Sequence, residues 1–189
     1  MKNFIIGYGS LINFESQNIT GISKWSMPVI LNSYTRSWSV VYDELNFCAL
    51  GIYPEKNKSI NAVLFEVDQL NPFDEREHGY SRHELDRSFL QTWKSTDQIP
   101  DNGKIWIYLP FKEKYGKASE KHFIWQSYLD VICMGCLSID QKFAEMFIET
   151  TSGFDFNFLN IDRDQSAYIR ALKKYDSAAI DKVMKSIKT

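Results

Sequence analysis

The sequence predicts an α+β fold, because segments typical of strands fill its first part and segments with helical periodicity fill its last part. Between residues 28 and 109, short runs rich in Val, Ile, Tyr and Trp alternate with turn-forming residues. Short spacing of this kind favours an antiparallel sheet or a small barrel. From about Ser119 the apolar residues instead recur at the three- and four-residue spacing of an amphipathic helix.

The composition is that of an ordinary globular protein. The chain has 189 residues, of which 44% are hydrophobic and 24% charged, enough to bury a core without disulfides. Its 22 basic and 24 acidic side chains give a formal charge of -2, which argues against a nucleic-acid partner. The apolar run near the N-terminus is too short for a secretory signal, and the three cysteines suggest no disulfide framework. We therefore expect a cytoplasmic protein that binds no membrane.

The first predicted strand is an apolar run that ends at two closely spaced glycines. Phe4, Ile5 and Ile6 precede Gly7 and Gly9. Two glycines after a buried strand allow another molecule to approach the main chain, so that successive N–H groups can converge on a carboxylate or an oxyanion. An ordinary tight turn has the same pattern, so these glycines alone do not separate a binding loop from a turn.

Three more strands are predicted after a polar stretch, residues 13–26, that is interpreted as a loop or a short helical turn. They cover residues 28–42, 47–53 and 61–67, and the turns between them cover residues 43–46 and 54–59. A short helix should follow from Asp68 to about Glu77, because Asp68 can cap it and Pro72 is tolerated in a first turn. Two further strands are predicted at residues 80–90 and 104–109.

The last part of the chain is predicted to be helical. One helix is expected from about residue 119 to 135, and a second should begin at the capping box formed by Ser138 and Gln141 and end near Gly153. A final pair is predicted at residues 164–175 and 176–187. Cys133 and Cys136 form a C-x-x-C inside the first of these patterns, where they are interpreted as buried helix cysteines.

A second stretch with chemical content is residues 73–82, Phe-Asp-Glu-Arg-Glu-His-Gly-Tyr-Ser-Arg. A solvated helix end is the plain interpretation of such a charged run. Metal-ligand residue types occur in and beside it, but their spacing matches no ligand pattern, so no metal is expected. These residues are Asp74, Glu77, His78 and His83.

Taken together, the two stretches resemble the γ-glutamylcyclotransferase superfamily, most closely its ChaC-type and related bacterial branches. The order and spacing of five segments carry the resemblance: residues 7–12 (Gly-Tyr-Gly-Ser-Leu-Ile), 36–38, 51–54, 63–67 and 74–82. The resemblance covers residues 1–109 and implies a small mixed β-barrel with peripheral helices. Residues 110–189 would then be a C-terminal helical extension packed on it, acting as a cover, a lid or a homodimer surface.

The resemblance also implies site residues. The family's pocket glutamate maps onto Glu77, with Glu75 as a rival, and the loop beside it maps onto Gly7, Tyr8, Gly9, Ser10 and Leu11. Tyr80 is expected either to orient Glu77 or substrate or to pack. Arg36 and Arg82 are candidate supporting residues, and for Arg36 both a paired substrate carboxylate and a salt bridge at the barrel rim are open.

The expected activity is release of 5-oxoproline from a small γ-glutamyl substrate without metal or cofactor. The α-amine of such a compound can attack its own γ-carbonyl, with one carboxyl group moving the proton. The sequence does not separate glutathione, γ-glutamyl amino acids and γ-glutamyl amines. A non-catalytic binding or scaffold protein that retains the barrel is the alternative.

Overall fold

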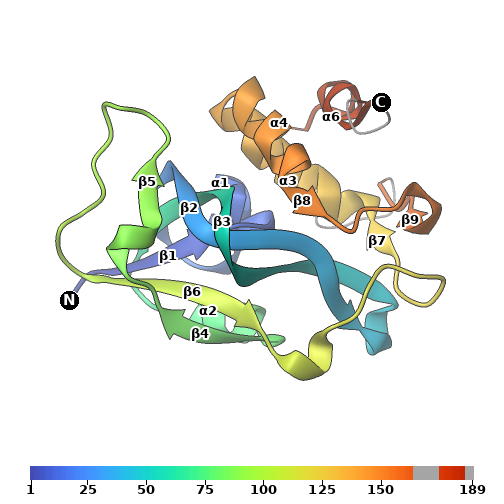
Figure 1. The fold of residues 1–189 in the computed structure, drawn as a ribbon, viewed down its shortest axis with the longest axis horizontal. Coiled ribbons are helices and arrows are strands. Elements are labelled where there is room, and N and C mark those ends of the chain that lie inside the picture. Colours follow the sequence, from blue (N-terminus) through green and yellow to red (C-terminus); the bar gives the residue numbers. More distant parts are fainter. Residues whose placement is uncertain (164–174, 186–189) are drawn as a thin grey trace.

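The computed structural model describes residues 1–163 and 175–185, in which a mixed sheet carries helices against it (Figure 1). The sheet strands are β1 (Asn3–Gly7), β2 (Ser23–Tyr42), β3 (Phe47–Val67), β4 (Tyr80–Glu84), β5 (Leu90–Thr92), β6 (Lys104–Pro110) and β8 (Thr151–Ser152). The strands β7 (Ile124–Trp125) and β9 (Leu159–Asn160) pair separately. The helices are α1 (Phe14–Thr20), α2 (Asn71–Arg76), α3 (Gln126–Ile139), α4 (Gln141–Glu149) and α6 (Ser177–Lys185).

The predicted α+β class is confirmed, but the predicted barrel is not. The strand order is β4-β6-β1-β3-β2-β5, with β8 paired to β2, so the described sheet has two ends and does not close. The strand β1 lies inside the sheet, antiparallel to β3 and parallel to β6. The loop that follows β1 therefore leaves the sheet from one of its central strands.

The long antiparallel pair of β2 and β3 corrects one predicted turn. Residues 54–59 do not reverse the chain, because β3 continues through them and pairs with β2 on both sides. Asn32 pairs with Ser59 and Tyr34 pairs with Pro54, so residues 55–58 project from the ladder as an exposed bulge. Polar side chains thus stay in water while apolar residues on either side of them remain in the core.

Several element ends also differ from the predictions. The helix α2 begins after Leu70 rather than at Asp68, and the predicted strand at residues 80–90 stops at Glu84. A 3-10 turn at Arg87–Phe89 follows, because the Asp86 side chain accepts a hydrogen bond from the Ser88 N–H and caps it. The helix α3 begins at Gln126, since residues 124 and 125 are in β7.

The helices of the C-terminal part share a core with the sheet (Figure 1). Ile5 and Phe65 of the sheet and Leu129, Ile132 and Phe143 of the helices belong to one buried cluster. The helix predicted at residues 176–187 is found as α6 over Ser177–Lys185, and its buried residues are Ile180, Val183 and Met184. The helix predicted at residues 164–175 lies outside the described residues, and the domain boundary at 109/110 stays a prediction.

None of the described helices has the length and apolar character needed to cross a membrane.

The cap of α4 is Asp140, not the predicted Ser138. The Asp140 Oδ1 atom accepts a hydrogen bond of 2.8 Å from the Phe143 N–H, and its Oδ2 atom accepts one of 2.8 Å from the Trp93 indole. The Ser138 hydroxyl instead donates to the Gly135 carbonyl inside α3. Asp140 forms the cap because it lies directly before the first helical residue, where the first N–H groups of the helix lack partners.

Asp140→Ala should therefore destabilise the fold by about 1 to 2 kcal/mol, because it removes a cap and leaves the Trp93 donor without its acceptor. Ser138→Ala is the matched control and should change the free energy of unfolding by less than about 0.5 kcal/mol. Urea denaturation of both variants measures this. Equal losses in the two variants would contradict the assignment of the cap.

Candidate functional site

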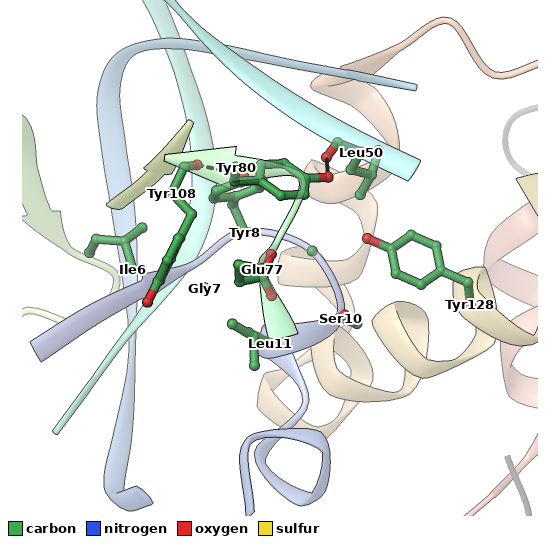
Figure 2. A pocket seen from close by; sticks show the side chains of 11 residues that line it. Ile6, Gly7, Tyr8, Ser10, Leu11, Leu50, Glu77, Tyr80, Tyr108 and Tyr128 are labelled. Carbon is green, nitrogen blue, oxygen red and sulfur yellow. Dashed lines mark hydrogen bonds between the residues drawn. The ribbon is translucent and has the colours of Figure 1, made fainter. Parts of the chain in front are cut away.

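A small pocket forms where the loop after β1 meets the end of α2 (Figure 2). Its lining residues come from β1 and the loop after it, from β3, from the C-terminal end of α2, and from β4, β6 and α3. They are Ile6, Gly7, Tyr8, Gly9, Ser10, Leu11, Leu50, Glu77, Tyr80, Tyr108 and Tyr128. The cavity has a volume of about 30 Å³, enough to hold a water molecule. A larger ligand has to move one of the walls or extend toward solvent.

The glycine loop, residues 7–11, takes its shape from a tight fold-back. The chain leaves β1 at Gly7 and enters a 3-10 turn at Ser10–Ile12, closed by a hydrogen bond from the Ile12 N–H to the Gly9 carbonyl. A Cβ atom on Gly7 would lie 2.7 Å from the Leu11 carbonyl oxygen, so only glycine fits there. The loop residues predicted to bind a ligand therefore do line one pocket together.

The Glu77 side chain enters this pocket from the C-terminal end of α2. Its N–H group donates to the Phe73 carbonyl, and Phe73 is fully buried against Phe65, which fixes the end of the helix on the core. The Glu77 side chain is 17% exposed and lines the pocket. The rival Glu75 is exposed and is not among the lining residues.

Burial raises the pKa of the Glu77 carboxyl above its ordinary value, and the neighbouring charges of Arg76 and His78 oppose this shift. The Nε atom of Arg76 lies 3.4 Å from Glu77 Oε1. The same guanidinium donates to the hydroxyl oxygens of Ser10, at 2.9 Å, and Ser16, at 3.0 Å. Arg76 therefore connects the glycine loop, α1 and Glu77.

Three of the tyrosines that line the pocket donate hydrogen bonds through their hydroxyls, two to main-chain carbonyls and one to Asp74. Tyr8 donates to the Tyr108 carbonyl at 2.6 Å, and Tyr80 donates to the Leu50 carbonyl at 2.7 Å (Figure 2). Tyr80 thus lines the pocket, as expected, but its hydroxyl donates to the Leu50 carbonyl and not to Glu77. The Tyr108 hydroxyl donates to Asp74 Oδ1 at 2.8 Å.

The two predicted supporting arginines lie behind the pocket. Arg82 forms an ion pair of 2.5 Å with Asp74, so it supports Tyr108 through that carboxylate. Arg36 is fully buried and is not among the lining residues. Its Nη1 atom donates to the Tyr8 carbonyl at 3.0 Å. Its described hydrogen-bond partners are neutral oxygens, so the expected salt bridge is not found among the described residues, and pairing with a substrate carboxylate stays a prediction.

Sequence reasoning missed several residues of this site, among them the apolar lining residues Ile6 and Leu50. Tyr108 and Tyr128 line the pocket, and Arg76 holds its loop to Glu77. The tyrosines gave no separate signal because aromatic residues in strands and helices usually pack. Arg76 lies inside the charged run at residues 73–82, where its partners were not evident.

The described residues contain no group of three or more His, Cys, Asp or Glu that could hold a metal ion. Cys133 and Cys136 are free and buried, which confirms their interpretation as helix cysteines. Burial raises the pKa of the Cys136 thiol to about 12. These thiols are therefore packed, protonated groups.

Comparison with known proteins supports the fold. No family model matches the chain, and no curated protein matches its sequence. A solved γ-glutamyl cyclotransferase structure matches with a TM-score of 0.61 and 14% identity, covering 98% of this chain and 99% of that one. An uncharacterized protein from Homo sapiens matches with a TM-score of 0.59 and 14% identity, covering 100% and 99%.

The chain thus has the fold found in a γ-glutamyl cyclotransferase structure, and the match runs through nearly its whole length. A match over 98% of the chain extends well beyond residues 1–109, the part that the sequence resemblance covers. In Figure 1, α3 and α4 lie beside the long β2–β3 pair, so these helices and the sheet form one structural unit.

Glu77→Gln should stabilise the protein at neutral pH, because the raised pKa of Glu77 means that its ionised form is unfavourable in the fold. The contribution of Glu77 to stability is complete below its unfolded pKa, near 4.5, and is lost as the pH rises through the folded value. A glutamine at this position does not ionise, so the free energy of unfolding of the variant should increasingly exceed that of the wild type as the pH rises above about 4.5.

Thermal or urea unfolding between pH 4 and pH 8 measures this, with Glu75→Gln as the matched control on the exposed side of α2. The control should follow the wild-type pH dependence. If the stability of Glu77→Gln depended on pH in the same way as that of the wild type, the raised pKa of Glu77 would be contradicted.

Proposed function

We propose that the protein is a γ-glutamylcyclotransferase that releases 5-oxoproline from a γ-glutamyl compound. The observation that carries this proposal is that a half-buried carboxyl group, Glu77, and the glycine loop, residues 7–11, line one pocket. The fold shared with a γ-glutamyl cyclotransferase structure supports it. Glutathione, a γ-glutamyl amino acid and a γ-glutamyl amine all contain the required γ-glutamyl group.

The reaction is a ring closure within the substrate. The α-nitrogen attacks the γ-carbonyl carbon, a new C–N bond closes the five-membered ring, and the bond to the leaving nitrogen breaks. The attacking ammonium must first lose a proton, and the leaving nitrogen must gain one. Because both groups belong to one bound molecule, the protein contributes mainly by holding the bent conformer and moving protons.

Glu77 is suited to both proton transfers. As a carboxylate it takes a proton from the ammonium group, and as the resulting acid it gives that proton to the leaving nitrogen. A carboxyl group with its ordinary pKa is a weak base for an ammonium, so the shift caused by burial improves the match. The charge of Arg76 opposes this rise in the pKa and so favours the ionised form of Glu77.

The glycine loop is suited to hold the developing oxyanion or the substrate carboxylate. The N–H groups of Ser10 and Leu11 lie at the start of the 3-10 turn, where the turn itself offers them no acceptor. Main-chain donors of this kind typically contribute about 2.7 to 4 kcal/mol each to transition-state stabilisation. In this scheme the shape of the loop, more than its side chains, decides the rate.

Glu77→Gln should lower kcat for 5-oxoproline formation by about 10² to 10⁴-fold, the usual range for removing a general acid–base group. Incubation with glutathione and with several γ-glutamyl amino acids and amines, followed by measurement of 5-oxoproline, tests this. Glu75→Gln is the matched control, because it removes an exposed carboxylate from the same helix, and it should stay within about 2-fold of the wild type.

Turnover that survives Glu77→Gln would refute the proton-transfer role. A wild-type protein that forms no 5-oxoproline from any of these substrates would favour the alternative, a non-catalytic binding or scaffold protein.

Gly9→Val should reduce kcat/KM far more than Ser10→Ala. A Cβ atom on Gly9 would lie 3.0 Å from the Tyr128 hydroxyl, so a branched side chain fills the pocket and displaces that ring. Ser10→Ala removes one hydroxyl acceptor of Arg76 but leaves the main chain unchanged. Steady-state kinetics of both variants measure this, and equal activity would contradict the loop model.

A further inference from the structure

Arg76 contacts both functional parts of the pocket without lining it. Its Nε atom faces Glu77, whose Oε1 atom is 3.4 Å away. Its Nη2 atom donates to the Ser10 hydroxyl oxygen at 2.9 Å. One guanidinium group thus joins the carboxyl group proposed to move protons to the loop proposed to hold the substrate.

The helix α1 fixes the orientation of this guanidinium. Arg76 Nη1 donates to the Ser16 carbonyl at 3.1 Å and to the Thr20 hydroxyl oxygen. Arg76 Nη2 donates to the Ser16 hydroxyl oxygen at 3.0 Å. Because a guanidinium is planar and rigid, bonds that hold its two Nη atoms also set the direction of its Nε atom. The position of the positive charge beside Glu77 is therefore determined by α1.

Arg76 carries the charge that acts most strongly on Glu77. On the other side of Glu77 in the sequence, His78 is exposed, so water screens its charge. Phenols occur on the elements around the carboxyl: Tyr8, Tyr42, Tyr80, Tyr108 and Tyr128. A phenol is neutral near pH 7, and burial raises the pKa of Tyr8, Tyr42 and Tyr80 further. Arg76 is therefore the main charge that acts on Glu77 at neutral pH.

We propose that Arg76 is a positioning residue for the cyclotransferase reaction and has two separable roles. Its charge favours the carboxylate form of Glu77, which takes the proton from the ammonium group. Its fork of N–H donors holds Ser10, and with it the glycine loop, in a fixed place beside Glu77. This inference rests on the proposed function. It gives α1 a part in the site, although the lining residues include none from that helix.

Arg76→Gln and Arg76→Lys separate the two roles, because both remove the fork but lysine keeps a positive charge. The charge role is measured by the acidic limb of the pH profile of kcat/KM, which reports ionisation of the base in the free enzyme. Without the charge, Glu77 needs a higher pH to form its carboxylate. The limb should therefore move to higher pH by about 1 unit in Arg76→Gln, and by less than half of that in Arg76→Lys.

The loop role is measured on the plateau of the same profile, where Glu77 is ionised in every variant. Both Arg76 variants should have a plateau kcat/KM about 10-fold or more below that of the wild type, because neither holds Ser10 and α1 together. The substrate is the γ-glutamyl compound that the wild type converts fastest. Its own groups titrate identically with every variant, so differences between the profiles report the protein.

Arg87→Gln is the matched control. Arg87 also donates to main-chain carbonyls, those of Pro100 and Gly103, and none of these residues lines the pocket. The control therefore removes one charge and one structural arginine, as Arg76→Gln does, but at another place. Its acidic limb should not move, and its plateau kcat/KM should stay within about 2-fold of the wild type.

A stability measurement gives a readout that does not depend on turnover. Glu77→Gln should raise the free energy of unfolding at pH 8 by more in the Arg76→Gln background than in the wild type, because loss of the charge raises the folded pKa of Glu77 further. If Arg76→Gln does not fold, Arg76→Lys alone still tests the proposal, since it should lose plateau activity with little movement of the acidic limb.

The outcomes separate this inference from the proposed function. An unmoved acidic limb in Arg76→Gln, or an equal movement in Arg87→Gln, overturns the charge role. Plateau activity equal to that of the wild type in Arg76→Lys overturns the loop role. Either result, obtained with an active wild type, leaves the cyclotransferase proposal standing. No 5-oxoproline from any γ-glutamyl compound overturns both.

Discussion

The buried guanidinium of Arg36 is the interaction on which the arrangement of this fold depends. Arg36 is fully buried on β2, and its donors reach the Tyr8 carbonyl, the Asn61 carbonyl and amide oxygen, the Thr150 and Thr151 hydroxyls and the Phe147 carbonyl. One side chain thereby joins the glycine loop, the β2–β3 pair and the end of α4. Burial lowers the pKa of Arg36 to about 9, which is still high enough to keep it charged at neutral pH. The carbonyl of Phe147, at the C-terminal end of α4, carries partial negative charge that favours the cation.

This constraint changes how the C-terminal region should be regarded. A segment attached only by surface contacts could be removed without changing the pocket. Here the end of α4 and the main chain of Tyr8 bind the same guanidinium, and α3 supplies Tyr128 to the pocket wall. Because loss of either partner would leave buried donors unsatisfied, the helices and the glycine loop are energetically coupled. The region expected to be an extension is thus part of the structure that shapes the site.

The sequence allowed the site to be predicted only where its chemistry is local. The apolar run ending at Gly7 and Gly9 and the charged run containing Glu77 are each continuous, and both line the pocket. The sequence indicates Arg36 as a candidate, but its role depends on Asn61, Phe147 and Thr150, which no spacing rule connects to it. The polar residues at 55–58 predict a turn, because polar residues are typical of both turns and bulges, and only the pairing with β2 distinguishes the two. Tyr128 could not be assigned because a tyrosine on an apolar helix face is usually a packing residue.

The tyrosines that line the pocket beside Glu77 help to explain why its pKa is raised. A carboxylate in a protein is usually stabilised by donors, and tyrosine hydroxyls would be suitable ones. Tyr8 and Tyr80 instead donate to main-chain carbonyls, and burial makes the pKa of each hydroxyl higher still, so neither can act as an acid or as a second anion near Glu77. The rings therefore desolvate the carboxyl without donating to it through those two hydroxyls. Arg76 is left as the charge that limits the shift, and its attachment to Ser10 makes the protonation of Glu77 depend on the position of the glycine loop.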